Sequence, residues 1–218
     1  MNGSLINIEG LDCSGKTKQV ELLKKRIPEI YGKDKLKNIH FPRTQDKNAL
    51  YANLIQKYLD GDMKQHNPYY IATLYANDRY KFKKRLDKWL KNNDIVICDR
   101  YVTSALAFQG SEIEEERRDE FFQWLKKYEY QFNRVPEPDI IIYLDVPISF
   151  IEDNLKKREY NDIHEKVDFL RKVKKVYNSI IDKSWVGYRI SCFKNGKMLS
   201  PTDINDKILL ILRDSNII

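Results

Sequence analysis

The sequence predicts an α/β fold in which a five-stranded parallel sheet is flanked by helices. Short runs rich in β-branched residues alternate with longer helical patterns, which is the arrangement that builds doubly wound sheets. The runs at 95–98 and 140–144 are continuously apolar, as is typical of parallel strands buried on both faces. The length of 218 residues fits one domain with a sizeable core.

Five short segments have the length and composition of strands. The last of them is the weakest candidate. Helical patterns lie between most of these candidates, so the connections are expected to be right-handed crossovers that pass over the faces of the sheet. In chain order, the candidate strands are residues 4–9, 36–41, 94–98, 139–145 and 187–192.

Three segments repeat apolar residues at helical spacing, and they cover residues 16–31, 70–92 and 165–182. Pro28 is expected to disturb or end the first of these helices, because proline lacks the backbone N–H that a helix uses. No internal repeat or Pro/Gly-rich linker divides the chain, so residues 1–218 are expected to form a single domain.

Local signals predict three further features. Ser200 is a favoured N-cap and Pro201 a favoured first residue for a final helix. Asn195-Gly196 marks a tight turn that suits a small hairpin. The acidic run at 112–116 suits a helix start, where carboxylates complement the helix dipole.

The composition narrows the class of protein. Lysine and arginine number 39 against 32 acidic residues, and the resulting net charge of +7 suits a polyanionic partner: a nucleotide, nucleic acid or acidic membrane. No apolar run is long enough to span a membrane, and the first residues do not resemble a signal peptide. The three cysteines are widely separated, which favours reduced thiols and a cytosolic compartment.

Residues 10–17 match the pattern G-x-x-x-x-G-K-[ST], between an expected strand and an expected helix. In a phosphate-binding loop (P-loop) of this kind, backbone N–H groups and the helix N-terminus bind phosphate oxygens. Lys16 is expected to reach the β- and γ-phosphates of ATP and Thr17 to ligate Mg²⁺. The expected nucleotide-binding residues are Gly10, Asp12, Cys13, Ser14, Gly15, Lys16 and Thr17.

Asp99 and Arg100 directly follow a buried candidate strand. Ligands of open parallel sheets bind beyond the carboxyl ends of the strands. Asp99 is therefore placed to reach Mg²⁺, directly or through water, and Arg100 to bind an anion. Together with the P-loop, these residues favour a phosphotransferase or nucleotide hydrolase.

Several motifs occur in the order found in thymidylate kinases, which are P-loop nucleoside-monophosphate kinases. The chain resembles that family over roughly residues 4–182. The matching segments are Ile8-Glu-Gly-Leu-Asp-Cys-Ser-Gly-Lys-Thr-Lys-Gln19, Phe41-Pro-Arg-Thr44, Leu74-Tyr-Ala-Asn-Asp-Arg79, Asp99-Arg-Tyr101 with Ser104-Ala-Leu-Ala-Phe-Gln-Gly110, Pro136-Glu-Pro-Asp-Ile-Ile-Ile-Tyr-Leu144, and Lys157-Arg158 with Asp162-Ile-His-Glu165.

The resemblance implies ATP-dependent phosphorylation of dTMP to dTDP, a step in dTTP biosynthesis. It implies that Tyr75 stacks on thymine, that Arg79 and Gln109 bind polar groups of the base, and that Phe108 walls the base. Arg43 and Arg100 are implied to bind the 5′-phosphate, and Asp12 to lie near the deoxyribose. The implied substrate-binding set is Asp12, Phe41, Arg43, Tyr75, Arg79, Arg100, Ser104, Phe108 and Gln109.

The resemblance also implies a lid at about residues 156–165 that closes over ATP, with Arg158 over the transferring phosphoryl group. It implies a homodimer formed through helices on one side of the sheet. The implied cofactors are ATP and Mg²⁺, and the expected location is the cytoplasm, with the nucleus as an alternative. The implied catalytic residues are Asp12, Lys16, Arg100 and Arg158.

Two other functions remain open at this stage. The first is a kinase for another nucleoside monophosphate or for a deoxynucleoside, whose neutral hydroxyl needs a general base. The second is a protein that binds nucleotides or nucleic acid without catalysis. The chain carries no helix-turn-helix, zinc or RNA-binding signature. The joint presence of Lys16, Asp99 and Arg100 favours catalysis.

Overall fold

The fold is built on one parallel sheet with the strand order β2-β3-β1-β4-β5. The computed structural model describes residues 3–32, 35–64, 66–156 and 166–218. The predicted fold class, a five-stranded parallel sheet flanked by helices, is confirmed. The strands are β1 Ser4–Gly10, β2 Leu36–His40, β3 Ile95–Asp99, β4 Ile140–Asp145 and β5 Gly187–Ser191, so the weakest candidate is confirmed as well.

The central strands of the sheet are buried almost throughout. β1 pairs in parallel with β3 on one side and with β4 on the other. All five residues of β3 and the first five residues of β4 are buried, as their continuous apolar runs predict. The edge strands β2 and β5 are more exposed.

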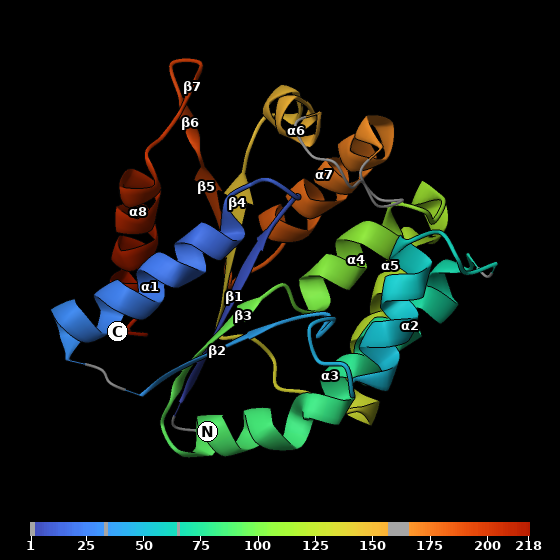
Figure 1. Ribbon diagram of the computed structural model, residues 1–218, viewed down its shortest axis with the longest axis horizontal. Coiled ribbons are helices and arrows are strands. Elements are labelled where there is room, and N and C mark those ends of the chain that lie inside the picture. Colours follow the sequence, from blue (N-terminus) through green and yellow to red (C-terminus); the bar gives the residue numbers. More distant parts are fainter. Residues whose placement is uncertain (1–2, 33–34, 65, 157–165) are drawn as a thin grey trace.

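Helices cover both faces of this sheet (Figure 1). α1 and α8 lie on one side, and α4, α5 and α7 lie on the other. α3 packs against β3 and α4, and α2 packs on α3. The helices are α1 Lys16–Tyr31, α2 Leu50–Leu59, α3 Pro68–Lys91, α4 Val102–Gly110, α5 Glu115–Lys126, α6 Ile148–Leu155, α7 Val167–Asp182 and α8 Pro201–Asp214, and the π-helix η1 spans Lys127–Phe132.

The expected helices at 16–31, 70–92 and 165–182 correspond to α1, α3 and α7. Pro28 does not end the first helix, because α1 continues through this residue to Tyr31. Pro28 stands in the last turns of the helix, where its missing N–H removes a single bond. The helix ends instead at Gly32, which adopts a left-handed conformation (φ 61°) and donates its N–H to the Pro28 carbonyl.

The predicted caps and turns are confirmed. The Ser200 hydroxyl accepts the N–H of Asp203 at the start of α8. Asn195 and Gly196 both have positive φ, 52° and 74°, as a two-residue hairpin turn requires. They join the short antiparallel strands β6 Phe193–Lys194 and β7 Lys197–Met198.

The register of the parallel strands brings chemistry-bearing residues to one edge. His40 at the end of β2 lies beside Asp99 at the end of β3, and Asp99 in turn lies beside Ile8 of β1. β1 ends at Gly10, where the P-loop begins. Among the described residues, no helix is long and apolar enough to cross a membrane.

Candidate active site

The P-loop joins β1 to α1 through backbone conformations that favour glycine. Gly10 and Gly15 have φ of 156° and 89°, and Cys13 between them has φ of 60°. A Cβ on Gly10 would stand 2.5 Å from the Ser14 hydroxyl oxygen and 3.1 Å from the Leu144 carbonyl oxygen. Glycine at position 10 therefore allows the loop to fold tightly against the end of β4.

Lys16 begins α1 and is buried under the loop. Its ammonium group donates to the carbonyl oxygens of Gly10, at 3.1 Å, and Leu11, at 2.8 Å. Burial, reinforced by the positive charge of Arg100, lowers the pKa of Lys16 to about 8. The lysine is thus folded back on the loop that phosphates would occupy.

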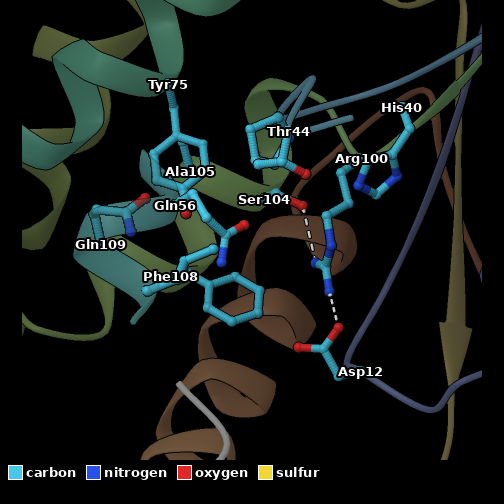
Figure 2. Close-up of a pocket in the computed structure, with 12 residues that line it drawn as sticks. Asp12, His40, Thr44, Gln56, Tyr75, Arg100, Ser104, Ala105, Phe108 and Gln109 are labelled. Atoms are coloured by element: carbon cyan, nitrogen blue, oxygen red, sulfur yellow. Dashed lines mark hydrogen bonds and ion pairs between the residues drawn. The ribbon is translucent and has the colours of Figure 1, made fainter. Parts of the chain in front are cut away.

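Arg100 is held at the edge of the site by a carboxylate, a hydroxyl and an aromatic ring (Figure 2). Its Nη2 donates to Asp12 Oδ1 at 2.6 Å, and its Nη1 donates to Ser104 Oγ at 3.3 Å. The guanidinium carbon lies 5.1 Å from the centre of the Phe108 ring. Burial would lower the pKa of Arg100, but Asp12 and other acidic neighbours raise it, so the side chain stays cationic.

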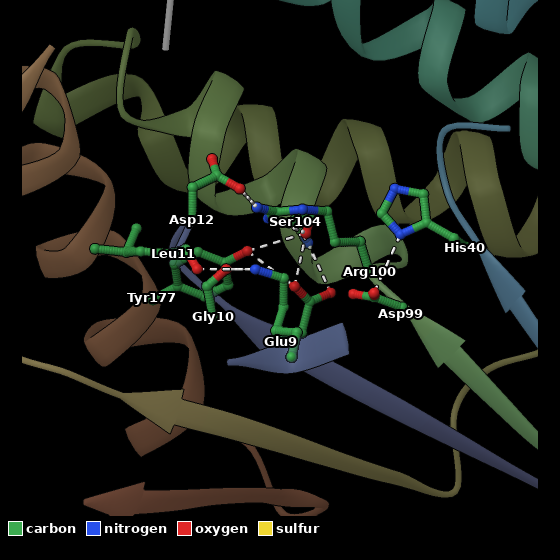
Figure 3. Close-up of polar contacts among 10 residues, drawn as sticks. Glu9, Gly10, Leu11, Asp12, His40, Asp99, Arg100, Ser104 and Tyr177 are labelled. Atoms are coloured by element: carbon green, nitrogen blue, oxygen red, sulfur yellow. Dashed lines mark hydrogen bonds and ion pairs between the residues drawn. The ribbon is translucent and has the colours of Figure 1, made fainter. Parts of the chain in front are cut away.

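Asp99 at the end of β3 is buried and faces His40, whose Nδ1 lies 3.2 Å from Asp99 Oδ2 (Figure 3). Burial by itself raises the pKa of Asp99. The hydrogen bond with His40 and the charges of Lys16 and Arg100 outweigh burial, and the pKa is lowered below its usual value of 3.8. Within the described part of the chain, Asp99 Oδ1 has no hydrogen-bond partner.

This unsatisfied oxygen fits a hydrated cation. Thr17, whose side chain is exposed, lines the same cavity as Asp99. A hydroxyl and a carboxylate oxygen are the ligands that Mg²⁺ takes in nucleotide sites, where it keeps several water molecules. The described residues contain no cluster of three or more His, Cys, Asp or Glu that could hold a metal alone. The donor set therefore fits a metal that arrives with a phosphate ligand.

Two cavities meet at this edge of the sheet. The first, of about 470 Å³, lies over the P-loop and is called the loop cavity here; it is lined by Asp12, Cys13, Gly15, Lys16, Thr17, Lys18, His40, Asp99, Arg100 and Asn154. The second, of about 180 Å³, is called the aromatic cavity; it is lined by Asp12, His40, Pro42, Thr44, Gln56, Leu59, Tyr75, Arg100, Ser104, Ala105, Phe108 and Gln109. Both are lined by Asp12, His40 and Arg100, which form their common border.

The aromatic cavity combines flat rings with polar groups. Tyr75 of α3 and Phe108 of α4 contribute the rings, and Ser104 and Gln109 of α4 contribute polar groups (Figure 2). The Gln109 amide nitrogen is buried and has no hydrogen-bond partner among the described residues. Such an arrangement suits a planar ligand with polar atoms at its edge.

Most of the sequence-predicted residues are brought together. Six expected substrate-binding residues line the aromatic cavity, and five expected nucleotide-binding residues line the loop cavity. Gly10 and Ser14 shape the loop without lining either cavity. The first group is Asp12, Tyr75, Arg100, Ser104, Phe108 and Gln109, and the second is Asp12, Cys13, Gly15, Lys16 and Thr17.

Phe41 and Arg43 are not brought to the aromatic cavity, in contrast to the expectation. Phe41 is buried in the core, edge-on to Phe82 with ring centres 5.9 Å apart. The Arg43 backbone N–H and guanidinium bind Asp78, a buried carboxylate on α3 that needs a cationic partner. The intervening Pro42 lines the cavity instead.

Arg79, which was expected to bind the base, lines neither cavity. It is fully buried, and its guanidinium binds Glu129 of η1 through Nε, at 2.9 Å, and through Nη2. Its Nη1 donates to the Tyr101 carbonyl oxygen at 3.3 Å. Because Glu129 is buried and would otherwise be an unpaired charge, this ion pair holds Arg79 in the core.

Arg158 and most of the expected lid, residues 157–165, lie outside the described residues. Sequence reasoning missed other residues of the site. His40 could have been noticed as a polar residue at the end of a strand. Gln56 and Leu59 come from α2, a helix that the sequence analysis did not predict. Glu9, buried beneath the site, was quoted only as part of a motif.

Comparisons with known proteins show which family the chain resembles. The family model described as thymidylate kinase matches residues 8–191. A probable thymidylate kinase from Methanococcus aeolicus is 33% identical, with 98% of this chain and 97% of the relative covered. Another from Pyrobaculum aerophilum is 29% identical, with 80% and 81% covered.

Solved structures show the same fold. Thymidylate kinase from Candida albicans superposes with a TM-score of 0.78 at 20% identity, over 99% of this chain and 93% of that one. Thymidylate kinase from Ehrlichia chaffeensis gives a TM-score of 0.66 at 21% identity, over 97% and 100%. The family consists of phosphotransferases whose activity is the conversion of dTMP to dTDP. On the extent of the family match and the relatives, this chain belongs to the thymidylate kinase family.

Proposed function

We propose that this protein transfers the γ-phosphoryl group of ATP to the 5′-phosphate of dTMP. The observation that carries the proposal is the common border of the two cavities at Asp12, His40 and Arg100. ATP phosphates in the loop cavity and a nucleoside monophosphate in the aromatic cavity would meet at this border. An oxygen of the 5′-phosphate then forms a bond to the γ-phosphorus, the bond to the β–γ bridging oxygen breaks, and ADP leaves.

In this proposal the aromatic cavity holds the acceptor. Tyr75 stacks on thymine, Phe108 walls it, and the unsatisfied Gln109 amide binds its polar edge. Arg100 binds the 5′-phosphate, and Asp12 both orients that arginine and lies near the deoxyribose. Three residues that do not line the cavity fix the position of α3 through contacts in the core: Phe41, Arg43 and Arg79.

On the donor side, Lys16 exchanges the carbonyl oxygens of Gly10 and Leu11 for phosphate oxygens of ATP. Thr17 and Asp99, the latter through water, would hold Mg²⁺, which neutralises phosphate charge when bound. The acceptor already carries an ionised phosphate, so positioning and charge stabilisation suffice without a strong general base. Arg158 of the lid is proposed to approach the transferring group on the evidence of the sequence alone.

Two further properties belong to the proposal. A homodimer through helices on one side of the sheet is supported by exposed apolar side chains on α2 and α3, namely Leu50, Tyr70 and Tyr80. Sedimentation at two protein concentrations tests it, and a monomer at both contradicts it.

A cytoplasmic location is supported by the three cysteines, which form no disulfide in the described structure.

The test is ADP release from ATP·Mg²⁺ with a panel of acceptors: dTMP, dUMP, dCMP, dGMP, AMP and thymidine. The wild-type chain is expected to turn over dTMP fastest, and Arg100→Ala to lose that activity. Arg117→Ala, which removes an exposed arginine of α5, is the matched control. Fastest turnover with another monophosphate or with thymidine would show that dTMP is not the preferred acceptor. Silence across the panel together with tight, salt-dependent binding of duplex DNA would contradict the proposal.

A further inference from the structure

Glu9 is a buried carboxylate on β1, immediately before the P-loop, and it receives five hydrogen bonds. Oε1 accepts from the backbone N–H groups of Tyr101, at 3.0 Å, and Ser104, at 3.1 Å, and from Asn7 Nδ2 at 3.1 Å. Oε2 accepts from the hydroxyls of Ser104, at 2.6 Å, and Tyr177, at 2.9 Å. The carboxylate therefore joins β1, α4 and α7.

Two of these bonds fix the start of α4. The first N–H groups of a helix have no partner within it, and a carboxylate there also complements the helix dipole. Glu9 binds the N–H groups of Tyr101, the residue before α4, and of Ser104 in its first turn. α4 carries Ser104 and Phe108 into the aromatic cavity. Glu9 thus anchors one wall of that cavity from below.

The hydroxyl bonds fix a polarity. Ser104 has one hydroxyl proton, and its shortest oxygen contact is the 2.6 Å bond in which it donates to Glu9 Oε2. The Tyr177 hydroxyl lies 2.9 Å from Glu9 Oε2 and 3.0 Å from Ser104 Oγ, so it can donate to either oxygen without taking the serine proton. The lone pairs of Ser104 Oγ then remain to accept Nη1 of Arg100 at 3.3 Å. A directed chain runs from Arg100 through Ser104 to Glu9, while the other end of the guanidinium is bound to Asp12.

We propose that Glu9 is a positioning residue for recognition of the acceptor phosphate: it keeps the Ser104 hydroxyl an acceptor and so holds the Arg100 guanidinium at the border of the two cavities. The inference rests on the proposed function. Glu9 lines neither cavity, and its effect reaches the phosphate only through Ser104 and Arg100.

Glu9→Gln is the sharpest variant, because it keeps the shape and replaces one oxygen with a donor. If the amide oxygen keeps the backbone N–H groups of α4, the amide nitrogen donates to Ser104 Oγ. The serine proton then turns either toward Arg100, so that two donors face each other, or toward Tyr177 Oη at 3.0 Å, so that Ser104 Oγ must accept the amide as well as Arg100. If the amide is reversed, its N–H₂ group faces the N–H groups of Tyr101 and Ser104. Both orientations therefore change the hydrogen bonds that hold Ser104, the residue through which Glu9 positions Arg100.

The readout is the ratio of the dissociation constants of thymidine and dTMP, measured by isothermal titration calorimetry. This ratio reports the contribution of the 5′-phosphate and is insensitive to a general loss of folded protein. Glu9→Gln is expected to lower the ratio by about 10- to 100-fold, the range for a lost hydrogen bond to a charged group, and to leave the thymidine constant within about twofold. An unchanged ratio, whatever the melting temperature, overturns the proposal.

Tyr177→Phe is the matched control. It removes the other hydroxyl on Glu9 Oε2, together with its 3.0 Å contact to Ser104 Oγ, and leaves Glu9 Oε2 as the acceptor of the Ser104 proton. It is expected to lower the melting temperature and to keep the ratio, and an equal fall of the ratio would overturn the polarity argument.

Ser104→Ala interrupts the hydrogen bonds between Arg100 and Glu9 without burying a new donor. It is the variant to measure if Glu9→Gln does not fold. It is expected to lower the ratio as well, and an unchanged ratio in Ser104→Ala again overturns the proposal. A wild-type protein that binds dTMP no tighter than thymidine would contradict the proposed function itself, which separates that failure from a failure of the role of Glu9.

Discussion

The Arg79–Glu129 pair and the Arg100–Asp12 pair join the same chemical groups in two different surroundings. The Arg79 and Glu129 side chains are 2% and 0% exposed, between α3 and η1. The Arg100 and Asp12 side chains are 12% and 28% exposed, at the border of the two cavities. The first pair is sealed in the core, and the second faces space that a ligand can enter.

The difference shows that burial decides what an ion pair does. A sealed pair has no other partner, so each charge is required mainly to satisfy the other. In the half-open pair, Asp12 and Ser104 occupy only part of the arginine's donors, and the cation stays available to a phosphate. Variants of the Arg79–Glu129 pair are therefore expected to lose stability, whereas variants of the Arg100–Asp12 pair are expected to lose activity.

The largest effect is expected from breaking the sealed pair. Arg79→Ala leaves the Glu129 carboxylate buried without a counter-charge, which is expected to cost about 3–5 kcal/mol of the free energy of unfolding. Urea unfolding measures it. Replacing both partners, as Arg79→Met with Glu129→Leu, is expected to recover most of the loss. A single variant as stable as the wild type would contradict the structural role given to Arg79.

Breaking the half-open pair is expected to act on the reaction. Arg100→Ala removes a cation from the point where phosphoryl charge develops, so kcat/KM for dTMP is expected to fall roughly 10²- to 10³-fold. Its melting temperature is expected to stay within a few degrees of the wild-type value, because the partly exposed Asp12 can be hydrated. If Arg100→Ala lowered the melting temperature without a specific loss of activity, the Arg100–Asp12 pair would have the same structural role as Arg79–Glu129, and the prediction would be wrong.

Lys16 is a third buried cation, but its ammonium group donates to carbonyl oxygens instead of a carboxylate. Its pKa is lowered to about 8. The folded protein therefore releases this proton before the unfolded chain does, and between about pH 8 and 10.5 rising pH favours the folded state. ATP binding needs the cation, so the affinity of the free protein for ATP is expected to fall about tenfold from about pH 7 to about pH 9. Calorimetric titration measures it, with Lys16→Met, expected to lack this pH dependence, as the control.

The smallest effect concerns backbone strain. Cys13 and Arg100 have φ of 60° and 65°, in the left-handed region that costs a side chain roughly 1–2 kcal/mol. Cys13→Gly relieves that strain and loses some chain entropy, so a net gain of about 0.5–1 kcal/mol in the free energy of unfolding is expected. Urea unfolding tests it against Cys13→Ala, which keeps the strain. Equal stability of the two variants would contradict this reading of the loop.

The sequence was informative where position along the chain fixes chemistry. The P-loop and Asp99-Arg100 follow strands, and the carboxyl ends of parallel strands meet at one edge, so their convergence was predictable. Arg79 and Arg100 could not be told apart in the same way. Arg79 is buried because it binds Glu129, which lies 50 residues later in the chain. Glu129 belongs to a π-helix that no local sequence pattern predicted. Gln56 was missed for a similar reason, since α2 brings it to the cavity only through packing on α3.

The most direct test of the central claim, that the two cavities form one continuous site, uses an analogue that joins adenosine and thymidine through a polyphosphate chain. The analogue is expected to bind more tightly than ATP or dTMP alone. Lys16→Met and Tyr75→Ala are both expected to weaken its binding, because each variant removes a contact in a different cavity. An analogue that binds no more tightly than ATP and is unaffected by Tyr75→Ala would contradict the account.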